Sequence, residues 1–298
     1  MTKPVTATAV MQLVETGLVD VDEPISTYVP EFDPLPPGGQ AHAGPVTVRH
    51  VLSHTSGLSD LPDLELRRLH ATQKAMLDAV SRQRLRFEPG TAYAYASDPW
   101  NLLSAIIERV SGTPFPAYLR NRVLGPLRMN ATSFDSRDPG PEPLPPQGSF
   151  VLDDLAPDQL VTMMAGLAMP GGGLWSTPED VANFGRAMLL GGEIGGAQVL
   201  TPLSLERMIR LETGGLREFG TGEPVHYGLG WSLPGLAGGS PASQSAFGHG
   251  GATGSALLVD PAHDLVIVYL RNWWGVSSDA TDEAVAAVYA AFIQGDLT

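Results

Sequence analysis

The chain has 298 residues, of which 43% are hydrophobic, and its formal net charge at pH 7 is −14. This hydrophobic share can build one large packed domain or two smaller ones. The acidic balance argues against binding to nucleic acid or to an anionic membrane surface, because both are negatively charged themselves. The absence of cysteine excludes a disulfide framework, a thiolate metal site and a cysteine nucleophile. A small, uncharged substrate fits this composition best.

The first predicted element is a helix in MTKPVTATAVMQLVETG. Apolar residues recur there at helical spacing and predict one buried stripe: Val10, Leu13, Val14 and Leu18. Pro4 places the helix start within about one turn upstream, since proline is tolerated in the first turn, where N–H groups have no intrahelical partner. Polar residues interrupt the segment, so neither a signal peptide nor a membrane span is predicted. We therefore expect a cytoplasmic protein without a membrane partner.

Three further helices are predicted to begin at a capping residue followed by proline, at Asp98-Pro99, Thr177-Pro178 and Thr201-Pro202. Two Pro/Gly-rich stretches, PEFDPLPPGG and DPGPEPLPPQG, are predicted to be surface loops. After about Gly220, the segments YGLGWSL, FGHGGATGSALLVDP and LVIVYLRNW favour strands, and a helix is expected from about Asp279. We predict an α+β fold, with residues 1–215 mainly helical and residues 216–298 forming an antiparallel sheet with a covering C-terminal helix.

The run LVIVYL, residues 265–270, is apolar without alternation, which is typical of a strand covered on both faces. The strand ending at Asp260 supplies one hydrogen-bonded neighbour. No other segment obviously supplies a second one. We therefore expect N-terminal strands to be absent from the sequence, and residues 265–270 to form an open edge that favours association.

Three residues could carry chemistry, although each has an ordinary structural explanation. A lysine in a first helical turn, such as Lys3, is usually solvated; a tyrosine in YAYAS, such as Tyr95, is usually in the core or at a rim; and a histidine in HGG, such as His249, usually marks a turn. Each alone is weak evidence of function. Their occurrence together, each within a longer recognisable sequence motif, makes a functional role more convincing.

These blocks resemble the serine β-lactamase and penicillin-binding superfamily, in particular its class C β-lactamase-like branch with family VIII carboxylesterases, D,D-peptidases and D-aminopeptidases. They follow the family order across nearly the whole chain: MTKPVTATAVMQLVE, VTVRHVLSHTSGL, PGTAYAYASDPWNLLSAIIERVSG, LGPLRMNATSF, GGGLWSTPEDVANF, YGLGW and FGHGGATGSALLVDP. The resemblance implies a β-lactamase/transpeptidase-like fold. It is much less specific for substrate.

The family's first motif is S-x-x-K, with the nucleophilic serine at the start of a helix and the lysine one turn later. Lys3 matches this lysine, so the serine is expected directly before Met1. Tyr95 and Ser97 match the first and third residues of Y-x-N or Y-x-S. Forming a tyrosinate at pH 7 ordinarily costs about 4 kcal/mol, so Tyr95 is expected to act as a base only beside a cation, with Lys3 as that cation.

The last motif places His249 where class C β-lactamases carry the lysine of K-T-G; H-x-G is the version of many peptidases and esterases. The resemblance implies that His249 contacts the substrate and that Gly250 and Gly251 let it lie along the strand. It also implies oxyanion donors from the Ala252 amide and from the serine's own amide. Trp175 in GGGLWST is expected either to line the cleft or merely to turn the chain.

Together these features favour a serine hydrolase that works through an acyl-enzyme, most readily an esterase of small acyl esters. A D-amino-acid peptidase or amidase, a weak β-lactamase and a non-catalytic relative remain alternatives. Neither H-E-x-x-H nor a phosphate-binding glycine loop occurs, so no metal or nucleotide cofactor is expected. His54 in HTSG is expected to be structural. The 298 residues alone should hydrolyse little, because the serine would precede Met1.

Overall fold

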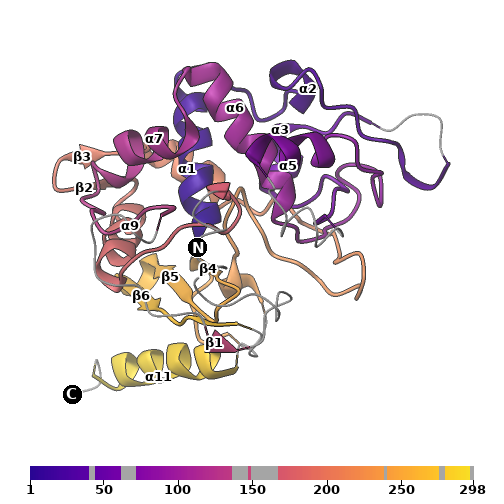
Figure 1. Cartoon of the computed structure of the whole chain (residues 1–298). Coiled ribbons are helices and arrows are strands. Elements are labelled where there is room, and N and C mark those ends of the chain that lie inside the picture. The colour runs from indigo at the N-terminus through magenta and orange to yellow at the C-terminus, as the bar shows by residue number, and fades with distance from the viewer. Residues whose placement is uncertain are drawn as a thin grey trace.

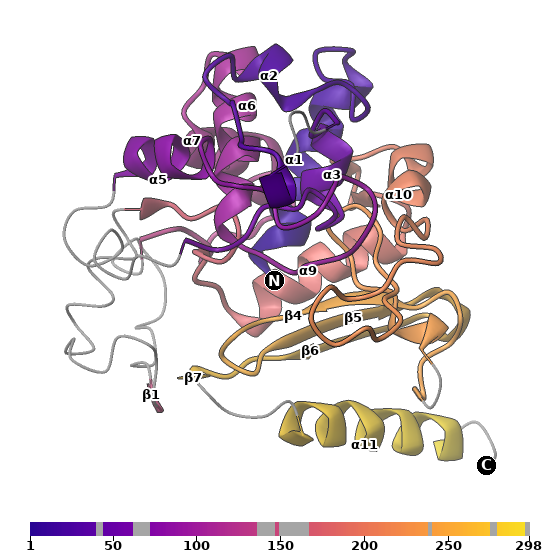
Figure 2. The same cartoon turned by 90° about the vertical axis from the view of Figure 1, so that its right-hand side faces the viewer.

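A computed structural model describes residues 1–39, 44–61, 72–135, 147–148, 167–237, 240–274 and 279–295. Strands β4 (Phe247–Gly250), β5 (Ala256–Asp260) and β6 (Leu265–Tyr269) form an antiparallel sheet in that order. Helix α9 (Pro178–Leu189) covers one face of the sheet and α11 (Asp279–Gly295) the other, and the remaining helices lie beyond α9 (Figures 1 and 2). This arrangement confirms the predicted α+β fold and the covering C-terminal helix.

The first helix, α1 (Thr2–Glu15), runs through the helical part of the molecule, and its N-terminal turn lies above the sheet (Figure 1). Nearly all of its residues up to Leu13 are buried, so it is enclosed on every side and does not present a single apolar stripe. Leu18, which was predicted in the stripe, is 50% exposed. The reason is local, because the helix ends at Glu15 and the chain turns at Gly17, whose φ is +73°.

Shorter elements complete the helical part. The other α-helices among the described residues are α2 (Ile25–Tyr28), α3 (Val48–Leu52), α5 (Gln73–Val80), α6 (Asn101–Ser111), α7 (Phe115–Leu119) and α10 (Pro202–Met208). Single helical turns occur at η1 (Pro37–Gly39), η2 (Asp98–Trp100), η3 (Arg120–Leu124), η4 (Pro234–Leu236) and η5 (Pro261–His263). Two-residue strands pair β1 (Gln147–Gly148) with β7 (Trp273–Trp274) and β2 (Glu193–Ile194) with β3 (Ala197–Gln198). No helix among the described residues combines the length and hydrophobicity needed to span a bilayer.

Two of the three predicted helix caps are confirmed. The hydroxyls of Thr177 and Thr201 each accept the backbone N–H three residues further on, at the starts of α9 and α10. Asp98 behaves differently, because it opens the turn η2 ahead of α6 and its carboxylate accepts the backbone N–H of Leu61 at 2.7 Å. Its carboxylate thus ties two loops together near the first turn of α1.

The segment YGLGWSL was predicted as a strand, and this prediction is wrong. It forms only isolated bridges, between Tyr227 and Ser232 and between Ser232 and Gly248. Gly230 has a φ of +81°, and a β-carbon added there would lie 2.5 Å from Cβ of Ala7. The segment is therefore a tight turn pressed against α1, which only glycine permits at this position.

Strand β6 explains the apolar run without alternation. Val266 and Val268 pack into the main core on the α9 side, whereas Ile267 packs against Tyr289 of α11. Within the described residues β5 is the only strand that pairs with β6, in agreement with the expected open edge. The main core takes residues from both sides of position 215, and the division into 1–215 and 216–298 stays a prediction. Most of DPGPEPLPPQG lies outside the described residues.

Candidate active site

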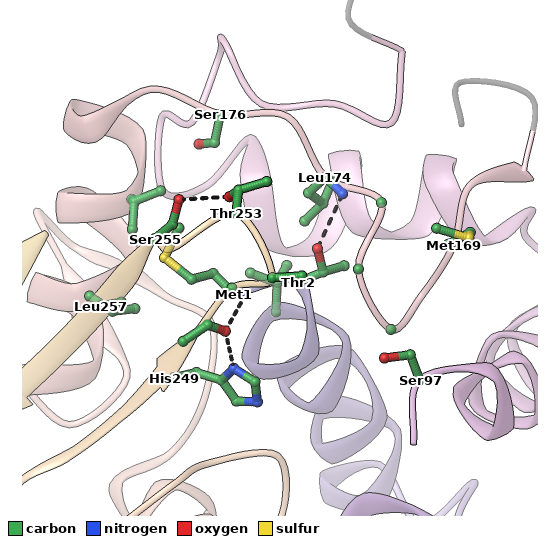
Figure 3. A pocket seen from close by; sticks show the side chains of 18 of the residues that line it. Met1, Thr2, Ser97, Met169, Leu174, Ser176, His249, Thr253, Ser255 and Leu257 are labelled. Atoms are coloured by element: carbon green, nitrogen blue, oxygen red, sulfur yellow. Dashed lines mark hydrogen bonds between the residues drawn. The ribbon is translucent and has the colours of Figure 1, made fainter. Parts of the chain in front are cut away.

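A cavity of about 1330 Å³ lies where the first turn of α1 meets the end of β4 (Figure 3). This volume has room for both an acyl group and a leaving group. Seven of the predicted site residues line it: Tyr95, Ser97, Trp175, His249, Gly250, Gly251 and Ala252. Lys3 lies behind this lining and is only 1% exposed. The structure thus gathers all the predicted residues in one place.

The Nζ atom of Lys3 is the centre of a hydrogen-bond cluster. It lies 2.8 Å from the hydroxyl of Tyr95, 2.9 Å from Oγ of Ser97 and 2.8 Å from the carbonyl oxygen of Gly171. The carbonyl can only accept, whereas each hydroxyl can donate or accept. An ammonium donates to all three groups, while a neutral amine can accept from one hydroxyl. Both protonation states of Lys3 are therefore satisfied by the same set of neighbours.

Burial decides which state of Lys3 dominates. It lowers the pKa of Lys3 to about 7, although the nearby carboxylates of Asp60 and Asp98 act in the opposite direction. Burial also raises the pKa of Tyr95 to about 12, and the carboxylate of Asp60 adds to that effect. This order differs from the expectation that Lys3 stays a cation and lowers the pKa of Tyr95. The lysine is the better base, because its amine form is populated near neutral pH.

Tyr95 itself borders the cavity, and 48% of its surface is accessible. Its ring lies against that of His54, with centroids 4.4 Å apart and planes tilted by 34°. His54 is 3% exposed and has a φ of +59°, and its Nδ1 accepts the backbone N–H of Ala96 at 3.3 Å. Its expected structural role therefore includes supporting the ring of Tyr95.

Two contributors to this cluster were missed at the sequence level. Asp60 Oδ1 accepts the backbone N–H groups of Ser97 at 2.6 Å and Asp98 at 2.8 Å, which fixes the loop that carries Ser97. Gly171 offers its carbonyl to Lys3, and a β-carbon at this position would lie 2.5 Å from the Ser97 carbonyl oxygen. The glycine run of GGGLWST was a visible signal for close backbone approach. Nothing in the sequence pointed to Asp60.

His249 is buried at the end of β4, and both of its ring nitrogens have partners inside the protein. Nε2 lies 2.9 Å from the hydroxyl of Tyr227. Nδ1 lies 2.6 Å from the carbonyl oxygen of Gly250, the contact drawn as a dashed line at the ring of His249 in Figure 3. Burial lowers the pKa of His249 well below its usual value, and the nearby amine of Lys3 adds to this. The ring is therefore neutral, and neither nitrogen is free to bind a substrate carboxylate.

The strand side of the cavity offers backbone groups instead. Gly251 donates its N–H to the Ser255 carbonyl at 2.7 Å, which closes the turn after β4. Among the described residues, the N–H of Ala252 has no hydrogen-bond acceptor, and this residue is exposed at the cavity. Gly250 and Gly251 would meet no atom closer than 3.5 Å with an added β-carbon, so open space beside the strand is what they provide. An unpaired amide here suits an oxyanion donor.

Trp175 has the first of the two roles considered for it, and its backbone also pairs with a second loop. It lines the cavity, and its backbone exchanges hydrogen bonds with that of Ser133 at 2.8 and 3.1 Å. Its indole Nε1 is buried without a partner among the described residues. Trp175 therefore both lines the cavity and holds two loops together.

Comparison with known proteins shows which family the chain resembles. A model of the Beta-lactamase family matches residues 1–291. Protein Rv1367c of Mycobacterium tuberculosis is 31% identical over 322 aligned positions, covering 97% of this chain and 79% of the relative. A putative D-alanyl-D-alanine carboxypeptidase of Salmonella agona is 23% identical, covering 89% of this chain and 66% of that protein.

Solved structures show the same fold. EstCE1, a hydrolase with promiscuous acyltransferase activity, superposes with a TM-score of 0.79 at 24% identity, covering 97% of this chain and 83% of that one. A penicillin-binding protein homolog from Caulobacter crescentus gives a TM-score of 0.76 at 23% identity, covering 97% and 81%. Since the family model spans nearly every residue, the chain belongs to the beta-lactamase family, within the superfamily of serine β-lactamases and penicillin-binding proteins.

Proposed function

We propose that this protein is a serine hydrolase that cleaves small acyl esters through an acyl-enzyme. The observation that carries the proposal is the position of Lys3 in the first turn of α1, with Nζ at 2.8 Å from Tyr95 and 2.9 Å from Ser97. A buried amine whose pKa is about 7 can take a proton from an adjacent hydroxyl at neutral pH.

The nucleophile in this proposal is a serine three positions before Lys3, directly preceding Met1. Residues three apart lie on the same side of a helix, so this serine would face the amine of Lys3. The nitrogen of Met1 lies 3.3 Å from the carbonyl oxygen of Gly250. A residue preceding Met1 would therefore enter the cavity beside Gly250 and Ala252.

The reaction then follows from the geometry. The serine oxygen bonds to the acyl carbon while its proton moves to the amine of Lys3, and the negative charge on the carbonyl oxygen is stabilised by the Ala252 amide. The ester C–O bond breaks, and the alcohol leaves with the proton returned through Lys3 and Tyr95. Water then attacks the acyl-serine by the same proton route and releases the acid and the free serine.

The state of His249 supports an ester substrate over one that carries a carboxylate. Both ring nitrogens are occupied and the ring is neutral, so this side chain offers no cation to a D-amino-acid peptide or a β-lactam. The second candidate is a D-amino-acid peptidase, which is supported by the similarity to putative D-alanyl-D-alanine carboxypeptidases. A non-catalytic relative that binds ligands in the same cavity is the third.

One pair of proteins tests these alternatives: the chain extended upstream by Ala-Ser, and a control extended by Ala-Ala. We expect the serine-bearing protein to hydrolyse p-nitrophenyl acetate and to form a fluorophosphonate adduct on the added serine, detected by peptide mass spectrometry. The alanine control should do neither. Faster cleavage of D-alanyl amides or of a cephalosporin reporter would favour the other hydrolases. Absence of any adduct would favour the non-catalytic relative.

A further inference from the structure

Tyr227 lies outside the predicted site, yet its hydroxyl reaches it. The side chain is 3% exposed, and the hydroxyl lies 2.9 Å from Nε2 of His249. On the other side of the ring, Nδ1 is 2.6 Å from the carbonyl oxygen of Gly250. A carbonyl oxygen has no proton to give, so Nδ1 must carry the proton and donate. Nε2 is then an acceptor, and the hydroxyl of Tyr227 donates to it.

The hydrogen-bond chain continues into α1. The Gly250 carbonyl that accepts from His249 also faces the nitrogen of Met1 at 3.3 Å, as Figure 3 shows. Gly250 lies two residues before Ala252, whose amide is unpaired among the described residues. The chain of contacts from Tyr227 through His249 to Gly250 thus joins the strand end to the first turn of α1.

We propose that Tyr227 is a positioning residue: its hydroxyl donates to Nε2 and anchors the ring of His249, and the ring in turn holds the Gly250 carbonyl against the first turn of α1. This inference rests on the proposed function, because that turn and the strand end are the two elements expected to carry the oxyanion donors. Without the tyrosine proton, Nε2 of His249 is a buried acceptor that has lost its donor. The ring then keeps only one of its two anchors, so the Gly250 carbonyl, which accepts from Nδ1 at 2.6 Å, is held less firmly.

The hydroxyl of Tyr227 can be removed without changing the packing of its ring. The ring of Tyr227 packs edge-on against His54 at 5.1 Å and lies 5.8 Å from the ring of Tyr93. A phenylalanine at position 227 keeps these ring contacts and loses only the donor. Tyr93→Phe is a matched control, because Tyr93 is also buried in this cluster and its hydroxyl has no hydrogen-bond partner among the described residues.

The first test uses the chain as it exists and needs no activity. Nitrogen-15 NMR of the histidine side chains should show the Nδ1–H tautomer for His249 in the unmodified chain and in Tyr93→Phe. In Tyr227→Phe we expect the same tautomer but a downfield shift of Nε2, because this unprotonated nitrogen loses its hydrogen-bond donor. An Nε2–H tautomer in the unmodified chain, or an unchanged Nε2 shift in Tyr227→Phe, would overturn the proposal.

The second test uses the serine-bearing protein with p-nitrophenyl acetate. We expect Tyr227→Phe to lower kcat about ten- to hundredfold, since small displacements of catalytic groups have effects of this size, while KM changes little. Tyr93→Phe should stay within about twofold of the parent on the same scale. Equal kcat in Tyr227→Phe and the parent overturns the positioning role. A parent without turnover rejects the proposed function instead, and the NMR result then decides the anchoring of His249 independently.

Discussion

The two sides of the cavity solve different problems. On the helix side, the buried amine of Lys3 is surrounded by polar groups from Tyr95, Ser97 and Gly171. On the strand side, the ring of His249 is neutral and both of its nitrogens are bonded within the protein, while the Ala252 amide is left unpaired among the described residues. The difference teaches that the helix side offers groups that can accept and release a proton, whereas the strand side offers backbone donors.

The strongest test of the helix side of the cavity is a substitution of Lys3. In the serine-bearing protein, Lys3→Met should slow fluorophosphonate labelling by about a thousandfold or more, because general bases contribute up to about four orders of magnitude. Lys74→Met is the control, since Lys74 is a solvated lysine on α5 paired with Asp78. Labelling of Lys3→Met within tenfold of the parent would remove Lys3 from the base role.

The strand side is tested at Ala252. Ala252→Pro deletes the unpaired N–H, and loss of one oxyanion donor should lower kcat for p-nitrophenyl acetate by about a hundred- to thousandfold. Ala252→Ser keeps the amide and should remain close to the parent. Circular dichroism and thermal unfolding must match in both variants. Similar kcat values for the proline and serine variants would show that this amide does not hold the oxyanion.

The pH dependence sharpens the assignment of the base. The base form of Lys3 is the neutral amine, and its pKa is lowered to about 7. The serine-bearing protein should therefore lose about tenfold in kcat/KM per pH unit below about 7 and reach a plateau above it. A profile that keeps rising toward pH 10 would instead assign the proton transfer to the hydroxyl of Tyr95, because burial raises the pKa of that group to about 12.

The smallest expected effects concern His54, which supports Tyr95 from behind. His54→Asn tolerates the φ of +59° and keeps an acceptor for the Ala96 amide, but it removes the ring. It should lower kcat by about three- to tenfold while changing stability little. His54→Phe keeps the ring and leaves that amide unpaired, so urea unfolding should show a loss of about 1–3 kcal/mol. The reverse ranking would mean that the ring contact is incidental.

Local signals allowed much of the fold to be predicted. The caps at Thr177 and Thr201 depend on residues within one helical turn, and the apolar run of residues 265–270 reports the covering of both strand faces. YGLGWSL was misassigned because its alternation resembles a strand. The turn at Gly230 is imposed by the approach to Ala7, more than two hundred residues away in sequence.

The candidate site shows the same limit of local sequence signals. Motif resemblance identified Lys3, Tyr95 and His249, but it assigned them general roles. The lowered pKa of Lys3 depends on burial, and the internal pairing of His249 depends on Tyr227, 22 residues earlier in the chain. Neither burial nor a pairing between distant segments is written in the local sequence. Only the structure showed that His249, which was expected to contact the substrate, is hydrogen-bonded within the protein through both ring nitrogens.

The mixed set of neighbours around Lys3 has a consequence for the cost of proton transfer. One acceptor, the Gly171 carbonyl, is fixed, whereas the hydroxyls of Tyr95 and Ser97 can turn about their C–O bonds. A proton can therefore arrive at or leave Nζ while every heavy atom stays in place, and only hydroxyl hydrogens rotate. In the proposed reaction, the same arrangement of heavy atoms can therefore serve both acylation and deacylation.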